Sequence, residues 1–329
     1  MSLHEVARLN LHRDRITALT AGTCNCEALL LSGSDDGTVA LWDTRDSSAI
    51  GVIDGFVLGA DDSGITGVAF ASDFSLVVSY GSHVSVLDRR KLTRHIQRPA
   101  VELVDLDNEC DVEALSTRGD FVALVDEEGM TGVFDVTDSS IAIDKFAGAH
   151  EALASCVAIH PEQPEIATGG FDQKVHFWDM AEEALINGVD ANVMSNQASN
   201  QKQLVNPPFV YALDYWNIDN NVSTRMLASG HADGGIMCID GDSAKFWPDC
   251  HGYSISALQF VRSRPDLLVT AGLDRVIKLW SAESLFASEA SLSSSASKRS
   301  IPAEDDMQPQ MLFCLNLSAK PDTVATSET

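Results

Sequence analysis

Three stretches of the chain repeat one pattern of residues and spacing, and this repetition constrains the fold more than any other feature of the sequence. They are LLSGSDDGTVALWD (30–43), IATGGFDQKVHFWD (166–179) and LVTAGLDRVIKLWS (268–281). Each has an apolar run, a tight turn that ends in aspartate, and an alternating run that ends at tryptophan, a pattern typical of two strands joined by a turn. A unit that recurs along a chain predicts an array of similar modules.

Each copy also keeps four polar or aromatic residues at matching positions. A hydroxyl lies four residues before the aspartate, the tryptophan lies six residues after it, and a histidine lies 22 to 24 residues before it. The three sets are His12, Ser32, Asp36 and Trp42; His150, Thr168, Asp172 and Trp178; and His251, Thr270, Asp274 and Trp280. A carboxylate can hold the histidine ring, the ring can contact the hydroxyl, and the hydroxyl can accept from the indole N–H. We expect each set to form one buried structural network, because buried polar groups are tolerated when all are satisfied.

This spacing resembles that of the WD-repeat family, whose members fold as β-propellers with such a network inside a blade. A histidine, a hydroxyl and an aspartate in contact are also the constituents of a catalytic triad. Here the set recurs at three places in the chain, in the predicted blade interiors. We therefore interpret the sets as structural, and we predict no catalytic residue and no enzymatic activity.

Weakened copies fill the gaps between the three clear repeats, at residues 63–91, 110–138 and 206–242. A tail at 311–327 adds an inner strand and a second strand, and the N-terminal VARLNLH (6–12) has the pattern of an outer strand. Closing a ring with both chain ends removes exposed sheet edges. We expect a single all-β domain over residues 1–329, a seven-bladed WD-repeat β-propeller whose last blade is closed by the N-terminal strand.

Two polar stretches interrupt the repeats, at about 187–205 and about 287–310. The first is rich in Asn, Gln and Ser, and the second is rich in Ser. Neither contains enough apolar side chains to offset the entropy lost on ordering, so we expect both to be flexible insertions.

The formal net charge of −26 argues against general nucleic-acid binding, which depends on Lys and Arg at phosphates. No apolar run is long enough to span a bilayer, and the N-terminus lacks the apolar core of a signal peptide, so we expect no membrane contact and a cytoplasmic or nuclear location. The seven cysteines form no C-x-x-C pair and are expected to be reduced. A zinc site at Cys24, Cys26 and His12 is disfavoured by its spacing. We predict no metal and no cofactor.

Two neighbouring predicted blades end in an Asp-x-Arg sequence. Trp42, Asp43 and Arg45 end the first clear repeat, and Asp88 and Arg90 end the next blade. Residues 30–45 resemble a sixteen-residue box of WD-repeat proteins that dock on the damage-specific DNA-binding adaptor of cullin 4 ubiquitin ligases. The resemblance implies that these five residues bind the adaptor. A carboxylate can hold the guanidinium so that it presents a planar set of donors, although the ending also suits a purely structural role.

Five basic residues lie within ten positions beside the second Asp-x-Arg ending. They are Arg89, Arg90, Lys91, Arg94 and Arg98. Such a run is either a solvated loop or a patch that steers an acidic partner.

A longer resemblance covers most of the chain. GADDSGITGVAF (59–70), GSHVSVLDRR (81–90), CVAIHPEQPEIATGGFDQKVHFW (156–178) and LVNPPFVYAL (204–213) resemble one branch of the WD-repeat family, which is associated with the same adaptor. We predict a protein-interaction scaffold, a substrate receptor that docks on the cullin 4 adaptor, binds an unknown client and is monomeric on its own. A general scaffold subunit of a stable assembly and a reader of basic peptides remain as alternatives.

Overall fold

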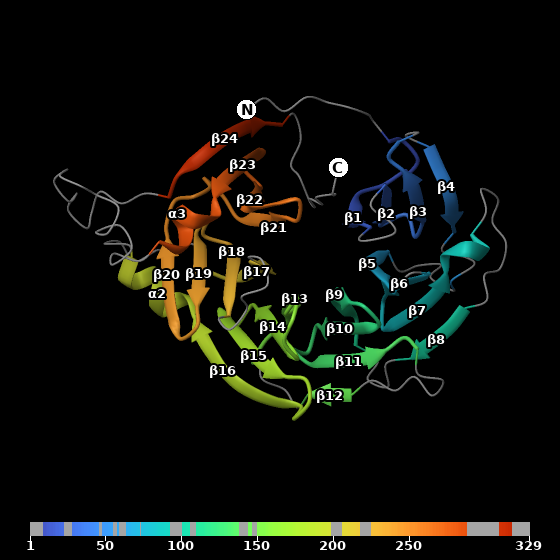
Figure 1. Cartoon of the computed structure of the whole chain (residues 1–329), viewed down its shortest axis with the longest axis horizontal. Coiled ribbons are helices and arrows are strands. Elements are labelled where there is room, and N and C mark those ends of the chain that lie inside the picture. Colours follow the sequence, from blue (N-terminus) through green and yellow to red (C-terminus); the bar gives the residue numbers. More distant parts are fainter. Residues whose placement is uncertain are drawn as a thin grey trace.

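The computed structural model describes residues 9–22, 28–45, 48–54, 58, 64–72, 74–92, 101–105, 110–137, 144–146, 150–198, 206–217, 225–287 and 309–317. Within these ranges the strands form six four-stranded antiparallel sheets, arranged as blades around one central axis (Figure 1). The first strand of each blade lies nearest the axis (Figure 1). The described part of the chain is therefore an all-β propeller.

The strands of each blade follow one another along the sequence. The first three blades are β1 (Ile16–Ala21), β2 (Leu29–Ser34), β3 (Val39–Asp43) and β4 (Ser48–Ile53); β5 (Ile65–Ala71), β6 (Ser75–Tyr80), β7 (His83–Asp88) and β8 (Val101–Asp105); and β9 (Val112–Arg118), β10 (Phe121–Asp126), β11 (Thr131–Asp135) and β12 (Asp144–Phe146). The other three are β13 (Ala154–Ile159), β14 (Glu165–Gly170), β15 (Lys174–Asp179) and β16 (Ala184–Asp190); β17 (Val210–Tyr215), β18 (Met226–His231), β19 (Ile236–Asp240) and β20 (Ser243–Trp247); and β21 (Ile255–Val261), β22 (Arg264–Gly272), β23 (Val276–Ser281) and β24 (Met311–Asn316). Short helices in the described part of the chain include η2 (Arg89–Lys91), α2 (Ala191–Ala198) and α3 (Ala282–Phe286).

Apolar side chains fill the space between neighbouring blades. Leu31 of the first blade, for example, packs in one buried cluster with Ile65 and Leu76 of the second. Gly33 is required at this contact, because a Cβ there would lie only 2.4 Å from Ile65 Cγ2. Similar clusters join each later pair of blades up to the sixth. Each described blade is thus held to the next by burial of apolar surface, which favours a rigid arrangement of the six blades.

Polar contacts also join the fourth and fifth blades. The guanidinium of Arg225 forms an ion pair with the carboxylate of Glu165, and Tyr215 Oη donates to Glu165 Oε1 at 2.9 Å. The side chains of Arg225 and Glu165 are only 14% and 8% exposed. Because each charge is both paired and hydrogen-bonded, the pair is tolerated in the interior.

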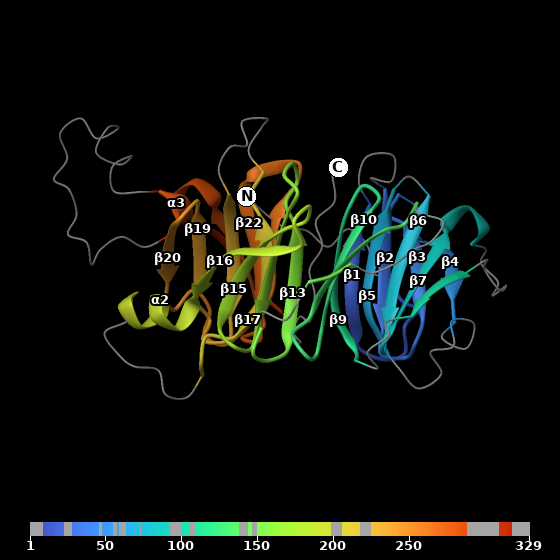
Figure 2. The same ribbon diagram turned by 90° about the horizontal axis from the view of Figure 1, so that it is seen from below.

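The strands run between the two faces of the ring (Figure 2). Because neighbouring strands in a blade are antiparallel, its first and third strands point the same way and end at the same face. We call this the exit face; in the first blade it lies at Ala21, which ends β1, and at Asp43, which ends β3. The turn between the second and third strands lies on the opposite face.

Seven blades were expected, and this prediction is wrong, because the described residues form six. The inner strand of a seventh blade was expected at about residues 311–318, but residues 311–316 form β24, which pairs with β23 as the outermost strand of the sixth blade. The physical reason is that α3 follows β23 directly, so the sixth blade takes its fourth strand from beyond the second insertion. Residues 9–12 are in no strand. Residues 6–8 of the expected closing strand, and 322–327 of the tail, lie outside the described residues.

The first expected insertion is also partly ordered. Residues 187–190 complete β16, and residues 191–198 form α2, whose Ala191 is buried. The polar composition hid these elements, because an outermost strand faces solvent and needs few apolar residues. Residues 199–205 and most of the second insertion lie outside the described residues. Among the described helices, none is long and apolar enough to cross a bilayer.

Candidate protein-binding face

The structure brings together all four residues of the predicted network in two blades. In the fourth, His150 Nδ1 lies 3.0 Å from an Asp172 carboxylate oxygen, and His150 Nε2 lies 2.8 Å from Thr168 Oγ1. Trp178 Nε1 donates to the same hydroxyl oxygen at 3.0 Å. The sixth blade repeats these contacts. His251 Nδ1 lies 3.0 to 3.1 Å from the Asp274 carboxylate oxygens, and His251 Nε2 lies 2.8 Å from Thr270 Oγ1. Trp280 Nε1 donates to the same hydroxyl oxygen at 2.8 Å. Each network lies within a blade, where it fixes the strands to one another.

The first blade builds its network differently. His12 Nε2 lies 2.6 Å from Ser32 Oγ, which also accepts from Trp42 Nε1 at 2.8 Å. Asp36 lies 3.7 Å from His12 Nδ1, which instead contacts Thr38 Oγ1 at 2.7 Å. Burial raises the pKa of Asp36, but hydrogen bonds from the Arg13 N–H and from Thr38 outweigh it and lower the pKa to about 2. Asp36 therefore holds His12 through the intervening threonine.

The fifth blade uses a histidine that the sequence analysis did not single out. His231 Nε2 lies 2.9 Å from Ser229 Oγ, and His231 Nδ1 lies 3.1 Å from the Pro208 carbonyl oxygen. This histidine belongs to β18 itself, whereas the expected position precedes the innermost strand. The signal in the sequence was the Ser-Gly-His run at 229–231, two residues before the turn aspartate Asp233.

The two Asp-x-Arg endings have the same geometry. Asp43 Oδ1 accepts from the backbone N–H of Arg45 at 3.0 Å and from its Nε at 2.9 Å, and Oδ2 accepts from Nη2 at 2.6 Å. In the second blade, Asp88 Oδ1 accepts from the backbone N–H of Arg90 at 3.0 Å and from its Nε at 2.9 Å, and Oδ2 accepts from Nη2 at 2.7 Å. The Arg45 side chain is 75% exposed and that of Arg90 is 61% exposed. The hydrogen bonds from Arg45 hold the pKa of Asp43 at about 2.

The aspartate of these endings has a structural task that does not depend on the arginine. Asp135 and Asp179 end the third strands of the next two blades, and each accepts from the backbone N–H two residues later at 2.8 Å. Thr137 and Ala181 occupy the arginine's position there. The aspartate closes the turn in all four blades, whereas the arginine distinguishes the first two.

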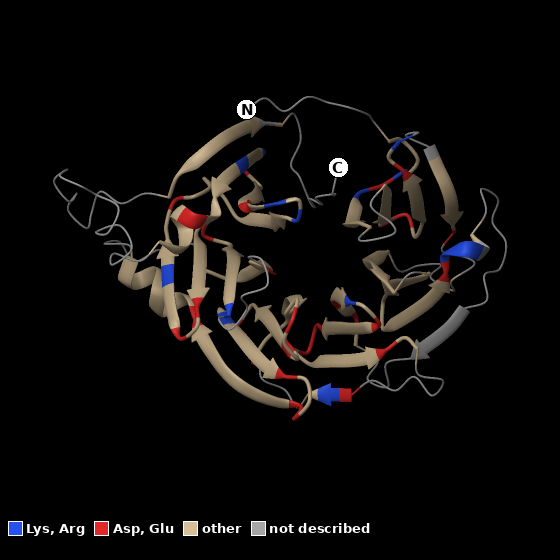
Figure 3. Ribbon diagram, viewed as in Figure 1, with Lys and Arg blue, Asp and Glu red and all other residues tan. Residues whose placement is uncertain are grey.

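Both arginines lie on the exit face, because each follows the end of a third strand. We call Arg45 and Arg90 the arginine pair. Arg90 stacks its guanidinium over the half-exposed ring of Phe74 at 4.3 Å, and Arg89 lies over the same ring at 5.4 Å. Elsewhere on the ribbon Asp and Glu gather at strand ends and turns (Figure 3). Of the expected basic run, the side chain of Lys91 and residues Arg94 and Arg98 lie outside the described part.

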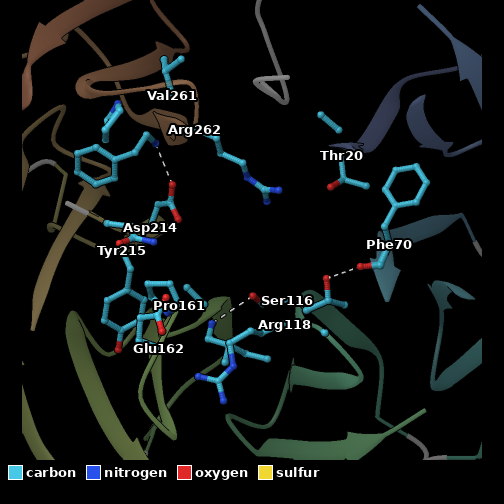
Figure 4. A pocket seen from close by; sticks show the side chains of 18 of the residues that line it. Thr20, Phe70, Ser116, Arg118, Pro161, Glu162, Asp214, Tyr215, Val261 and Arg262 are labelled. Carbon is cyan, nitrogen blue, oxygen red and sulfur yellow. Dashed lines mark hydrogen bonds between the residues drawn. The ribbon is translucent and has the colours of Figure 1, made fainter. Parts of the chain in front are cut away.

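A cavity of about 890 Å³ opens on the exit face at the central axis. The innermost strands of all six blades contribute to its lining where they end, so it is the mouth of the central channel. Arg262 points into this mouth, and Asp214 lies nearby (Figure 4). Arg118 is held by the carbonyl oxygens of His160, at 2.7 Å, and Gln163. Sequence reasoning missed this cavity, because its residues come together only when the ring forms.

Asp214→Asn is expected to stabilise the protein by about 3 kcal/mol at pH 7.5. Burial raises the pKa of the Asp214 carboxyl to about 6, against an ordinary value of 3.8. The ionised folded state is therefore penalised, and stability falls as the pH rises through 6. Asparagine carries no charge and still offers an oxygen to the Phe260 N–H, which now donates at 2.8 Å. Chemical unfolding at several pH values should show the advantage disappearing between pH 6 and 4; an advantage that is constant with pH contradicts the assignment.

Comparison with known proteins agrees with this architecture. The family model described as "WD domain, G-beta repeat" matches residues 4–43 and 143–179, which include strands of the first and fourth blades. The WD repeat-containing protein 53 homolog of Dictyostelium discoideum is 23% identical over 290 residues, covering 82% of this chain and 76% of that protein. The chain therefore contains WD repeats and resembles WD-repeat proteins over most of its length.

Other WD-repeat structures share the fold of this WD-repeat protein at low identity. The RRP9 WD40 repeats superpose with a TM-score of 0.73 at 15% identity, covering 97% of this chain and 86% of that one. The U3-55K structure superposes with a TM-score of 0.70 at 14% identity, covering 97% of this chain and 87% of that one.

A shorter sequence match is to Restriction of telomere capping protein 1 of Lachancea thermotolerans. It is 28% identical over 172 residues, which is 52% of this chain but 11% of that protein. WD-repeat propellers bind protein partners and generally serve as scaffolds, and this chain is a protein-interaction scaffold of that kind.

Proposed function

We propose that this WD-repeat protein is a scaffold subunit of a multiprotein assembly and that it docks one protein partner through the arginine pair on its exit face. The observation that carries the proposal is the matching two-point contact at Asp43–Arg45 and Asp88–Arg90 in adjacent blades. Such exposed ion pairs contribute little to stability. Repetition of the same geometry on one face therefore favours a role in binding.

The chemistry of the pair suits an interface. Each guanidinium uses its Nε and one Nη toward the aspartate, so N–H donors remain for carbonyl or carboxylate oxygens of a partner. The aspartate fixes the orientation of the guanidinium before binding, which lowers the entropy lost on docking. Arg90 and Phe74 together offer a charged and an aromatic surface, the residue types that are enriched in interfaces. The partner is expected to offer acidic or carbonyl groups.

The cullin 4 adaptor is a second candidate for that partner. Residues 30–45 support it, since they resemble the docking box that ends in Trp-Asp-x-Arg, and Asp88 and Arg90 support it through their matching geometry. In that role the protein is a substrate receptor, with a client bound at another surface. Our proposal places either assembly in the cytoplasm or the nucleus.

Affinity purification of the full chain from cells, followed by mass spectrometry, tests the proposal. A set of partners recovered in constant proportion supports a scaffold within a stable assembly, and recovery of the adaptor with cullin 4 supports the second candidate. Recovery of basic peptides alone, released by moderate salt, supports a peptide reader and contradicts docking through the arginine pair. Recovery of no partner contradicts both proposals.

A further inference from the structure

The fourth blade contains a buried histidine that the structural network does not use. His176 lies on β15 and is 7% exposed. In the described part of the chain, neither of its ring nitrogens has a hydrogen-bond partner. A buried polar atom without a partner costs about 1 to 3 kcal/mol, so the position calls for a ligand or another explanation.

The ring of His176 lies against the network of its own blade. His150 and His176 have ring centroids 4.7 Å apart and planes at 88°. One donor atom from each of His150, Asp172 and His176 can be chosen so that all three lie within 4.8 Å of one another. Gly188, opposite His176 on β16, leaves room for the ring, because a Cβ there would lie 3.0 Å from His176 Nδ1.

We propose that His150, Asp172 and His176 bind one divalent transition-metal ion, with Zn²⁺ as its occupant. Two imidazoles and one carboxylate form a ligand set that suits zinc, and three protein ligands leave one position for water. His150 Nδ1 and the Asp172 carboxylate are already 3.0 Å apart, close to the roughly 3.4 Å between ligands of a tetrahedral zinc ion. A rotation of the His176 side chain brings in the third ligand.

The hydrogen bonds around His150 allow this coordination. A neutral His150 can donate from Nδ1 to the Asp172 carboxylate and accept at Nε2 from the Thr168 hydroxyl, which satisfies both contacts. When the metal occupies Nδ1, the proton moves to Nε2 and is donated to Thr168 Oγ1, so the imidazole stays neutral. The threonine oxygen has two lone pairs, which can accept from both His150 Nε2 and Trp178 Nε1. A ligating histidine whose other nitrogen is held in this way is the usual arrangement at protein metal sites.

The other blades with tryptophan networks provide an internal comparison. His176 pairs with Thr168 across the strands, just as Ala40 pairs with Ser32 in the first blade and Lys278 pairs with Thr270 in the sixth. The sixth blade has the same histidine–aspartate contact but a lysine at the third position. The predicted site therefore depends on one residue that the repeats do not share.

Titration of the purified full chain with Co²⁺, read by visible absorption and by tryptophan fluorescence, tests the site. Trp178 is a suitable reporter because its ring centroid lies 6.2 Å from that of His176. Wild type should bind one equivalent with nitrogen and oxygen ligands, and Zn²⁺ should displace it. His176→Lys, which installs the residue of the sixth blade, should weaken binding by at least about 100-fold. Lys278→Phe is the matched control in the sixth blade and should bind Co²⁺ like wild type.

A gain-of-site variant provides a second test that does not depend on the folding of His176→Lys. Lys278→His should add a second equivalent beside His251 and Asp274, with a spectrum like that of the first. Absorption from thiolate ligands identifies binding at cysteines, which all these variants retain. Unchanged Co²⁺ binding by a folded His176→Lys variant, or wild-type binding through thiolates alone, overturns the proposal.

Discussion

Replacing Trp178 with alanine is expected to lower the free energy of unfolding by about 3 to 5 kcal/mol. The ring is 2% exposed and packs against Phe146 with ring centroids 5.8 Å apart, so its removal opens a cavity between the third and fourth blades. The change also removes a donor to Thr168, which is fully buried. Urea unfolding followed by circular dichroism measures the loss as a lower midpoint at an unchanged slope.

Leu87→Ala is the matched control for the tryptophan. Leu87 occupies the corresponding position in the second blade, is 1% exposed, and has no polar atom that could join a network. Its replacement should cost about 2 to 3 kcal/mol, through lost burial alone. If both variants lose the same free energy, the Trp178 hydrogen bond contributes nothing measurable, and an unchanged midpoint for Trp178→Ala contradicts the proposed network.

The double variant Arg45→Ala and Arg90→Ala should weaken binding of the docked partner by about 100-fold or more. A buried interfacial arginine commonly contributes about 2 kcal/mol, which is roughly 30-fold for each of the two residues. Thermal melting should change little, because both side chains are exposed and belong to no buried network. Titration of the purified partner, once it is identified, gives the two dissociation constants.

Lysine at the same two positions separates charge from geometry. A single ammonium keeps the positive charge but cannot make the two-point contact with Asp43 or Asp88. Arg45→Lys with Arg90→Lys should therefore also weaken binding, by less than the alanine pair. Binding that is fully restored by lysine would mean that charge alone attracts the partner.

The sequence predicted the blades that carry complete motifs better than it predicted the ring. Asp172 and Asp274 lie where their spacing to tryptophan placed them, because a hairpin of fixed length fixes that geometry. Thr38 could not be foreseen as the bridge between Asp36 and His12, since the spacing of the first blade matches that of the others. Which strand pairs with β23 depends on contacts across the second insertion, and so the number of blades was wrong.

The candidate face was only partly accessible to sequence reasoning. The Asp-x-Arg endings are local, so their positions on adjacent third strands follow from the repeat. Arg90 follows β7, and Phe74 lies in the turn between β5 and β6. Their stacking therefore brings together two separate turns of the blade, and no spacing rule describes that contact. The channel mouth needs strands from every described blade, and Arg262 gains its position only from the assembled ring.

Docking through the arginine pair is tested by comparing the partners recovered from the same cells by wild type, by the double alanine variant and by Arg264→Ala. Arg264 is a matched control, because it forms a similar two-point contact with Asp266, is 54% exposed, and lies on the exit face of the sixth blade, away from the arginine pair. We expect quantitative mass spectrometry to find the docked partner with wild type and with Arg264→Ala, and to find it strongly depleted with the double variant. Equal recovery by all three folded proteins would contradict it.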